Sequence, residues 1–416
     1  MAATKKSTAT KSPAAKESSA ATKGSAATRA VAAKGPAAPA VLSTRALNRA
    51  TLERQLLLRR TAMPAKDAVE HLVGLQAQNV KPPYYQLLAR LDGFDPAELA
   101  ALLESREAVR MVTLRSTIHL HTAADALTLR PFVQPARDRE VKLFRKGLVG
   151  VDPDRLKEAA RELVEERPRT PKEVREALAA RWPDADPQSL GTAARCLLPL
   201  VQVTPRGVWG RSGQVALTTV GHWLDGARER VPSPDDLVLR YLGAFGPASV
   251  RDMQSWAGLT RLREVFERLR PRLITFRDAN GTELFDLPDA PRPDEDTPAP
   301  PRFLPEFDNV LLGHADRTRV IPPRYRGRNG NGNQAYGAVL VDGFLAAIWR
   351  LGAGTGPETG SGPGSGAVAL TVQPLGDLGR TDRDAVTEEA MRMLTTMTAP
   401  DAAAYDIRFA TFVDFD

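Results

Sequence analysis

Residues 273–286 read LITFRDANGTELFD, and this stretch decides the fold class that the sequence predicts. Apolar and polar residues alternate on both sides of Asn280 and Gly281, a dipeptide that favours the two-residue turn of a β-hairpin. Helical patterns over about residues 234–243, 248–257 and 260–269 come directly before it. Three short helices followed by a β-hairpin are typical of a winged helix, which is a variant of the helix-turn-helix.

The same order occurs earlier in the chain. Helices are predicted over about residues 153–166, 171–181 and 187–198, with Thr170 suited to cap the second helix and Pro171 suited to open it. Residues 201–209 then predict a strand, a turn and a second strand. Three-helix units without nucleic acid are common, but a hairpin after the third helix favours the winged helix.

The first part of the ordered chain gives a looser version of this pattern. Helices are predicted over about residues 47–60, 65–76 and 96–105, and a single strand over 110–121. A helical stretch at 123–129 and a basic helix around 136–146 follow. We therefore expect winged-helix units at residues 46–150, 151–225 and 226–290.

The C-terminal part has a different composition. A Pro/Asp-rich linker at 286–305 leads to two loops, a basic one at 324–334 and a Gly/Ser-rich one at 352–366. Strands are predicted at 337–350, 367–374 and 407–413, and a helix at about 383–397. The sequence thus predicts an α+β protein with tandem winged-helix units and a β-rich domain at residues 291–416.

Composition narrows the function classes. The chain has 416 residues, of which 42% are hydrophobic, and it contains no apolar run long enough to span a membrane. Cys196 is the single cysteine, so no internal disulfide is possible, and we expect it to be a small buried residue in a reducing compartment. His119 and His121 have no cysteine or acidic residue nearby in the sequence, so neither a metal site nor a cofactor is expected.

The excess positive charge lies at the N-terminus. Residues 1–45 carry eight basic residues, among them Lys5, Lys6 and Lys11, against one acid, which equals the whole net charge of +7. This Ala/Lys/Ser-rich segment has little to bury and is expected to be disordered. It could be a transit peptide, a DNA-binding tail like that of a linker histone, or a tolerated extension. A tail that binds DNA would place the protein in the cytoplasm, at the nucleoid.

Two glutamines, Gln76 and Gln78, stand in the segment 71–84, HLVGLQAQNVKPPY. Apolar periodicity predicts a helix over 65–76, and residues i and i+2 of a helix point about 200° apart. The two amides can therefore converge only if the helix ends between them, as Asn79 and the following prolines indicate. Such a pair could hold a water molecule or a base edge, although spacing alone favours mere capping of the helix.

Further motifs make the chain recognisable. They are GLQAQ at 74–78, LRSTIHLH at 114–121, LPEFDN at 304–309 with HADR at 314–317, and VDGF at 341–344. In this order they resemble the bacterial winged-helix DNA glycosylases that unhook interstrand crosslinks, of the azinomycin-resistance type. The resemblance covers about residues 46–416. It implies tandem winged helices, double-stranded damaged DNA as the partner, and Gln76 and Gln78 as catalytic residues.

The chemistry of such an enzyme suits two amides. An N7-alkylated purine already carries a positive charge and leaves readily, so a positioned water is the main requirement. An amide carbonyl accepts a hydrogen bond from water and an NH₂ group donates one, but amides do not ionise and supply no general base. We therefore expect a monofunctional glycosylase that acts as a monomer. The alternative is a winged-helix regulator without catalytic activity, although regulators usually dimerise with one such unit per chain.

Other residues are candidates for DNA contact. Arg115 and His119 stand in the second motif, and Arg324, Arg326 and Arg328 in the basic loop. His119 could equally be a hydrogen-bonded core residue, and the loop arginines could simply be solvated. Asp308 and Asp316 could be catalytic carboxylates, but acids near Arg317 and Arg319 in the sequence more often form structural ion pairs.

Overall fold

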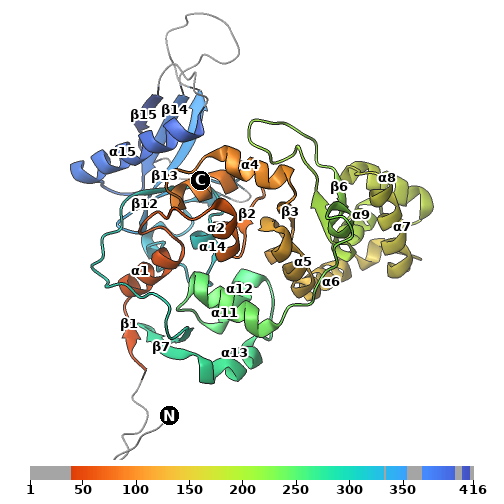
Figure 1. The fold of residues 1–416 in the computed structure, drawn as a ribbon, viewed down its shortest axis with the longest axis horizontal. Helices are drawn as coiled ribbons and strands as arrows, with labels where there is room; N and C mark the ends of the chain where they lie inside the picture. Colours follow the sequence, from red (N-terminus) through yellow and green to blue (C-terminus); the bar gives the residue numbers. More distant parts are fainter. Residues whose placement is uncertain (1–38, 332–333, 354–367, 399–404, 413–416) are drawn as a thin grey trace, which may run out of the picture. The chain divides into compact units, whose positions relative to one another are not determined.

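The computed structural model describes residues 39–331, 334–353, 368–398 and 405–412. Lys5, Lys6, Lys11 and most of the predicted Gly/Ser-rich loop lie outside these ranges. The chain from Pro39 onward forms one unit, in which helices alternate with three larger sheets and a small β-ribbon. The predicted α+β class is confirmed, and Figure 1 shows the arrangement.

An antiparallel sheet lies at the centre of this unit (Figure 1). Its strands, in spatial order, are β2 (Leu75–Gln76), β4 (Ile118–Thr122), β3 (Ala108–Val112), β5 (Leu200–Gln202) and β6 (Leu217–Thr219). The predicted single strand at 110–121 is in fact a hairpin, because the short turn η1 (Leu114–Ser116) separates β3 from β4. The predicted strand pair within 201–209 is also wrong, since β5 pairs with β6 instead.

The helices of the first part are α1 (Thr44–Arg54), α2 (Ala65–His71), α3 (Pro82–Arg90), α4 (Pro96–Glu104), α5 (Ala123–Phe132) and α6 (Gln134–Leu143). Helix α3 was not predicted, because its two initial prolines look like the end of the preceding helix. Proline has no N–H and a fixed φ, so it fits the first turn of a helix as well as the residues after one. All nine residues of α3 are buried.

The predicted helices of the second part are confirmed. Helices α7 (Pro153–Glu166), α8 (Pro171–Arg181) and α9 (Pro187–Leu197) agree with the predicted bounds within a residue. Thr170 caps α8 and forms a capping box with Glu173. Short elements η2 (Arg145–Gly147) and α10 (Val220–Trp223) flank this group.

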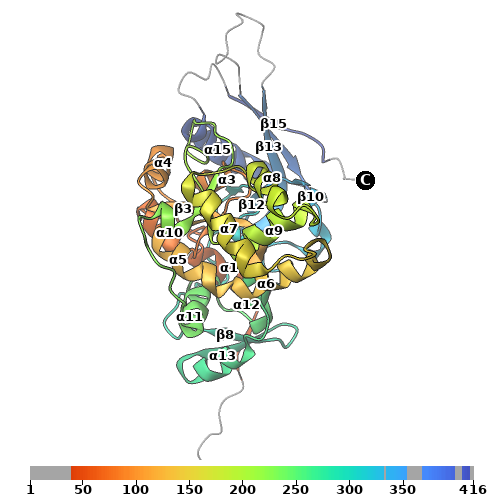
Figure 2. The ribbon, with the colours of Figure 1, turned by 90° about the vertical axis from the view of Figure 1, so that its right-hand side faces the viewer.

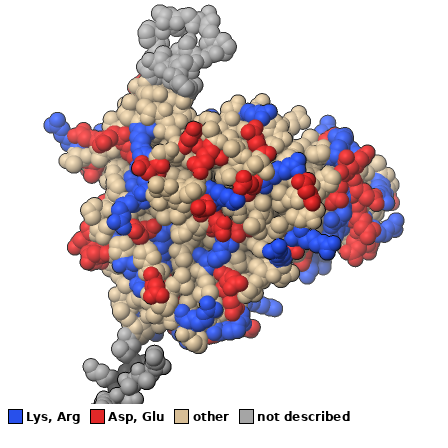
Figure 3. Space-filling model, in the orientation of Figure 1, with Lys and Arg blue, Asp and Glu red and all other residues tan. Residues whose placement is uncertain are grey.

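Charges on the visible face of this helix group are mixed. Figure 3 shows Lys and Arg interleaved with Asp and Glu, most densely over α7 and α8. Several are exposed ion pairs, such as Lys172 with Glu176 and Arg181 with Glu162. Exposed pairs of this kind contribute little stability and form no single-sign surface for phosphates.

The third part also follows the prediction. Helices α11 (Pro234–Phe245), α12 (Val250–Ala257) and α13 (Arg263–Leu269) and the turn η3 (Arg270–Arg272) precede the hairpin β7 (Ile274–Asp278) and β8 (Glu283–Asp286). Gly281 in the hairpin turn has φ +80°, a backbone conformation that residues with a side chain rarely adopt. Strand β1 (Val41–Leu42) adds to β7 in parallel.

The C-terminal part contains a five-stranded sheet. Its order is β15 (Tyr405–Phe409), β14 (Val368–Pro374), β13 (Phe344–Ala353), β12 (Gly337–Val341) and β9 (Arg302–Leu304). Helix α15 (Arg380–Met397) accompanies this sheet, and α14 (Asn309–Leu312), η4 (Pro323–Tyr325) and the β-ribbon β10 (Gly330–Asn331) and β11 (Gln334–Ala335) complete the part. Figures 1 and 2 both place β13–β15 and α13 at opposite ends of the unit.

Helix α3 joins the two sheets in one core. The Tyr85 ring lies 5.6 Å from the ring of Trp349 in β13 and 6.5 Å from that of Trp209, measured between ring centroids. Burial of such aromatic side chains dominates the energetics of a core. Residues 46–150 also share the central sheet with residues 151–225 through the pairing of β3 with β5. Within the described ranges, no helix combines the length and apolar character needed to cross a membrane.

Candidate active site

Gln76 and Gln78 do not lie at a helix terminus, contrary to the prediction. Helix α2 ends at His71, and Gln76 is the last residue of strand β2, paired with His119 of β4. The extended backbone continues one residue further, because Ala77 donates its N–H to the Ile118 carbonyl over 2.8 Å. Gln78 lies two residues further on, in a bend just beyond β2, so the strand and this bend, and no helix end, position the two amides.

A glycine makes the step from helix to strand possible. Gly74 has φ +97°, and a Cβ there would lie 2.2 Å from Nδ1 of His121. Both the backbone conformation and the close approach require glycine at this position. The motif GLQAQ therefore begins with a residue that places β2 directly against β4.

The Gln76 side chain is held at one end only. It is 5% exposed, and its Oε1 accepts a hydrogen bond from Nη2 of Arg115 over 2.7 Å. Its Nε2 has no hydrogen-bond partner among the described residues. Its main-chain carbonyl accepts a bond from Nε2 of Gln86 in α3 over 2.9 Å. The amide is thus fixed in orientation, with its NH₂ group available as a donor.

Arg115 is the group that orients Gln76. It has φ +52° in the turn η1, and its Nη1 donates to the Trp256 carbonyl over 2.6 Å. Burial and the charge of Arg317 lower the pKa of Arg115 to about 10. No carboxylate contacts its guanidinium in the described part of the chain. Both terminal nitrogens of Arg115 contact protein groups, and its predicted contact with DNA stays a prediction.

His119 is neutral and its tautomer follows from its partners. The Thr117 carbonyl can only accept, so His119 Nδ1, 3.1 Å away, carries the proton. Its Nε2 is therefore unprotonated, and the lone pair of this nitrogen faces Nη2 of Arg115 at 3.3 Å. Burial and the positive charge of Arg115 hold the pKa of His119 well below its usual range. Of the two predicted alternatives, the structure shows the buried, hydrogen-bonded residue.

Gln78 differs from Gln76 in exposure. Its side chain is exposed, and its Oε1 accepts a hydrogen bond from the Ile118 main-chain N–H over 3.2 Å. The intervening Ala77 carbonyl accepts from Nη2 of the buried Arg110 over 2.7 Å. The segment 76–78 is thus tied down on both sides while one amide faces solvent. We call Gln76, Gln78, Arg115 and His119 the glutamine site.

The LPEFDN motif supports the glutamine strand from behind. Asn309 Nδ2 donates to the Gly74 carbonyl over 2.9 Å. Asp308 accepts two bonds of 2.8 Å from Arg90 of α3, and both side chains are fully buried. Asp308 is therefore a structural ion pair, as the sequence suggested, but with Arg90. Sequence reasoning missed the supporting roles of Arg90 and Gln86 because it missed α3.

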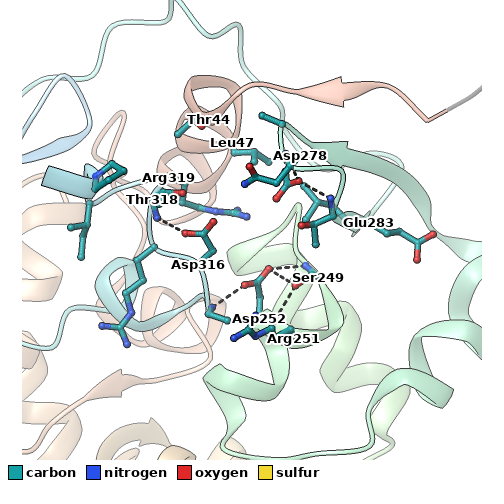
Figure 4. Close-up of a pocket in the computed structure, with 18 of the residues that line it drawn as sticks. Thr44, Leu47, Ser249, Arg251, Asp252, Asp278, Glu283, Asp316, Thr318 and Arg319 are labelled. Atoms are coloured by element: carbon teal, nitrogen blue, oxygen red, sulfur yellow. Dashed lines mark hydrogen bonds between the residues drawn. The ribbon is translucent and has the colours of Figure 1, made fainter. Parts of the chain in front are cut away.

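A second polar region lies around α12, and Figure 4 shows it. Asp252 accepts from the N–H and hydroxyl of Ser249 over 2.8 Å each and from the Ala315 N–H over 2.9 Å. Arg319 and His314 lie nearby and are buried. Burial of the Asp252 carboxylate works against a low pKa, but the charge of Arg319 and the hydrogen bonds from Ser249 lower the pKa of Asp252, while burial lowers the pKa of His314 to about 3. We call Ser249, Asp252, His314 and Arg319 the charged junction.

The charged junction adjoins a cavity of about 920 Å³. Its carboxylates are already engaged in the protein. Asp316 accepts the Thr318 N–H, and Asp278 accepts the N–H groups of Asn280 and Thr282 in the hairpin turn. These bonds are local to their own turns, while the bond from the Ala315 N–H to Asp252 joins the HADR motif to α12, and together they indicate a structural role.

The remaining predicted residues lie elsewhere. Arg324 and Arg326 are exposed, and the Arg324 guanidinium lies 4.7 Å from the Tyr325 ring centroid. The Arg328 guanidinium lies 5.4 Å from the Phe412 ring centroid. Cys196 is buried as predicted, and burial raises the pKa of its thiol to about 11. In the residues that the structure describes, no cluster of histidine, cysteine and acidic side chains could hold a metal ion.

The fold and the glutamine site thus define an α+β protein whose buried polar strand presents neutral amides. Residues 69–396 match the family described as DNA glycosylase AlkZ-like, so the chain belongs to these DNA glycosylases, which hydrolyse N-glycosyl bonds in DNA. The family resemblance predicted from the motifs is confirmed.

A relative and a solved structure, both from Streptomyces sahachiroi, illustrate the likeness. An interstrand DNA cross-link repair glycosylase is 24% identical over 328 residues, which cover 72% of this chain and 85% of that protein. The solved structure of the DNA glycosylase AlkZ is similar in fold, with a TM-score of 0.69 and 21% identity over 89% of this chain and 100% of AlkZ.

Proposed function

We propose that this glycosylase removes N7-alkylated purines from double-stranded DNA and unhooks interstrand crosslinks formed at such bases. The observation that carries the proposal is the Gln76 amide. Arg115 holds this amide, and among the described residues no group that could act as a general base contacts it. His119 cannot serve as a base for solvent, because its Nε2 lone pair faces Arg115. A site of this kind suits a base that is already a good leaving group.

The glutamines position the attacking water. Each Oε1 accepts one protein hydrogen bond and keeps a second lone pair that can accept from water. The water oxygen adds to C1′ while the electron pair of the C1′–N9 bond moves onto the cationic purine. The base leaves neutral, and the proton of the water goes to solvent. Orientation alone can account for a large part of such a rate enhancement.

Neutral side chains also suit the substrate. A carboxylate at this place would pair with Arg115 and would have to be desolvated together with it. We propose unhooking of crosslinks because the relative from Streptomyces sahachiroi is an interstrand DNA cross-link repair glycosylase. A crosslinked base is tied to the opposite strand and cannot flip out fully, so an exposed glutamine such as Gln78 is useful.

A track of arginines would lead phosphates to the site. Burial and the charge of Arg317 lower the pKa of Arg115, and burial and the charge of Arg326 lower the pKa of Arg317. Guanidinium groups that repel one another would be stabilised by an anion between them. We propose Arg317 and Arg326 as phosphate contacts, with Arg324 and Arg328 of the same loop and the tail lysines as further contacts.

The architecture is proposed to follow the DNA-binding function. Helices α11–α13 with β7–β8 form one winged helix, and residues 46–150 and 151–225 form two related units before the β-rich part at 291–416. We propose that the protein acts as a monomer, which the molar mass from light scattering tests directly. The regulator alternative would require sequence-specific binding without base release.

The decisive experiment is base release from duplex DNA. Wild type and the variant Gln76→Ala/Gln78→Ala are incubated with DNA that carries N7-methylguanine or an N7-linked crosslink. We expect release and unhooking by the wild type, a loss of at least about 100-fold in the variant, and unchanged DNA affinity. Exposed Gln188 in α9 gives the matched control Gln188→Ala. Tight binding without release by the wild type would overturn the proposal.

A further inference from the structure

A cavity of about 220 Å³ opens beside Gln78. Six apolar side chains from the central sheet and the end of α9 form most of its wall: Met111, Val112, Ile118, Leu198, Leu200 and Leu217. The exposed residues of its lining include Gln78 and Ser116, which mark the side that is open to solvent. The apolar cavity thus lies next to the Gln78 amide, which is proposed to position water.

Several polar groups of the lining are engaged with protein partners. Arg130 donates to the carbonyls of Cys196 and Leu198, and Arg195 pairs with Glu140 at 3.2 Å. Among the described lining residues, Oε1 of Gln202 in β5 is the fully buried side-chain atom that has no hydrogen-bond partner. A buried acceptor without a donor is costly, so a ligand that brings one N–H or O–H group would be favoured here.

We propose that this cavity binds a planar, mostly apolar ring group carried on N7 of the damaged purine. The inference rests on the proposed function and specifies its substrate class. Purine N7 and N9 belong to the same five-membered ring, so a substituent on N7 begins close to the bond that is broken. A substituent near the glutamines can therefore extend past Gln78 into the cavity.

Size and polarity select this occupant. An apolar cavity of about 150 Å³ accommodates benzene, so about 220 Å³ leaves room for one ring or two fused rings. An extruded purine would fit by volume, but its edges carry several polar atoms, and the buried part of the described wall offers a single unpaired acceptor. A base in this place would leave most of those atoms unpaired.

The test fills the cavity without touching the glutamines. Val215 lines it from a loop and is half-buried, so Val215→Trp adds an indole to the space. Val231 is 88% exposed and outside the cavity, which makes Val231→Trp the matched control. Release rates are measured on duplexes that carry N7-methylguanine, N7-benzylguanine or N7-(naphthylmethyl)guanine, and thermal unfolding confirms that each variant is folded.

We expect Val215→Trp to lower kcat/KM for the two ring-bearing adducts by about tenfold relative to N7-methylguanine, and Val231→Trp to change neither. An equal loss on all three substrates would overturn the proposal and assign the cavity to the base itself. Unchanged rates on all three would also overturn it.

A second variant covers the case in which Val215→Trp does not fold. Gln202→Met removes the free acceptor and keeps the volume of the side chain. The wild type is expected to prefer an N7-(hydroxybenzyl)guanine duplex over the benzyl one, and the variant to lose this preference. An identical preference in both proteins would contradict the assignment of Gln202.

Failure of the proposed function can be distinguished from failure of the cavity proposal. A wild type that releases none of these bases overturns the glycosylase specificity. Equilibrium binding of the same duplexes then tests the cavity alone, because tighter binding of the ring-bearing adducts than of the methyl adduct should disappear in Val215→Trp. No such difference in the wild type would remove the cavity proposal as well.

Discussion

The glutamine site and the charged junction are both buried polar regions that contain arginine and histidine, yet they treat charge differently. At the charged junction the carboxylate of Asp252 lies near Arg319 and His314, and despite burial its pKa is lowered by the charge of Arg319. At the glutamine site Arg115 meets the neutral Gln76 and His119 and no acid in the described chain. At the charged junction the protein supplies the counter-charge of the arginine, and at the glutamine site it does not.

This difference in charge compensation distinguishes a structural region, the charged junction, from a functional one, the glutamine site. A buried cation without a counter-ion is expensive, and structural sites usually supply the missing acid. A protein can keep such a group where an anionic partner arrives from outside, and the family acts on DNA, which is a polyanion. Supplying or removing carboxylates in the two regions is therefore the most direct way to test the comparison.

The largest expected effect comes from the removal of the acid at the charged junction. Asp252→Ala leaves Arg319 and His314 buried without their carboxylate and frees the N–H groups of Ser249 and Ala315. We expect a loss of about 3–5 kcal/mol in the free energy of unfolding, measured by urea denaturation. Asp235→Ala, which removes an exposed partner of Arg268, should cause no measurable change. Equal effects of the two variants would contradict a compensating role for Asp252.

The next effect comes from adding an acid to the glutamine site. In Gln76→Glu the new carboxylate pairs with Arg115 and replaces the NH₂ donor. We expect stability to be kept or raised, and base release to fall by about 100-fold, the loss typical of one removed donor. Gln188→Glu at the surface of α9 controls for the added charge. Full activity of Gln76→Glu would show that the Nε2 donor has no part in catalysis.

Arg115 distinguishes positioning from DNA contact. If it acts by holding Gln76, Arg115→Met lowers kcat by about tenfold, worth about 1.4 kcal/mol, and leaves KM and the salt dependence of DNA binding unchanged. If it contacts a phosphate, Kd rises and the slope of log K against log salt decreases by about one. Arg324→Met, at an exposed position, is the reference for a change in the salt slope alone.

The sequence predicted elements better where local signals agree. Helices α7–α9 begin with Asp-Pro, Thr-Pro and Asp-Pro pairs that both cap and open a helix, and their bounds were predicted within a residue. The hairpin β7–β8 was fixed by Asn280 and Gly281. In such segments neighbouring residues determine the backbone, so no distant contact is needed for the prediction.

Prediction failed where distant contacts decide. The glutamine strand β2 has two residues and exists because it pairs with β4, some forty positions later. Periodicity through residues 69–75 therefore looked helical, and the left-handed residues Val73 and Gly74, which follow the end of α2 at His71, were not recognised. The motifs identified Gln76 and Gln78, but the link from Arg115 to Gln76 depends on a turn, η1, inside a segment that was predicted as one strand.

The smallest expected effect concerns the pH dependence of the buried histidines. Burial lowers the pKa of His121 to about 4, below the unfolded value near 6.5. Between these values the unfolded chain binds a proton that the folded chain does not, so stability is lost as the pH falls from about 6.5 toward 4. His121→Gln keeps a partner for Thr113 Oγ1 but cannot titrate.

We therefore expect His121→Gln to reduce the loss of unfolding free energy between about pH 7 and 5.5 by about 1 kcal/mol, measured by urea denaturation at each pH. Exposed His222 meets water in the folded and unfolded states alike, so His222→Gln should leave the profile of the wild type unchanged. A profile of His121→Gln that coincides with the wild type would mean that folding does not lower the pKa of His121. The ring of His121 stacks on that of His119, with 5.6 Å between centroids, so protonation of His121 would then place a second positive charge next to the glutamine site.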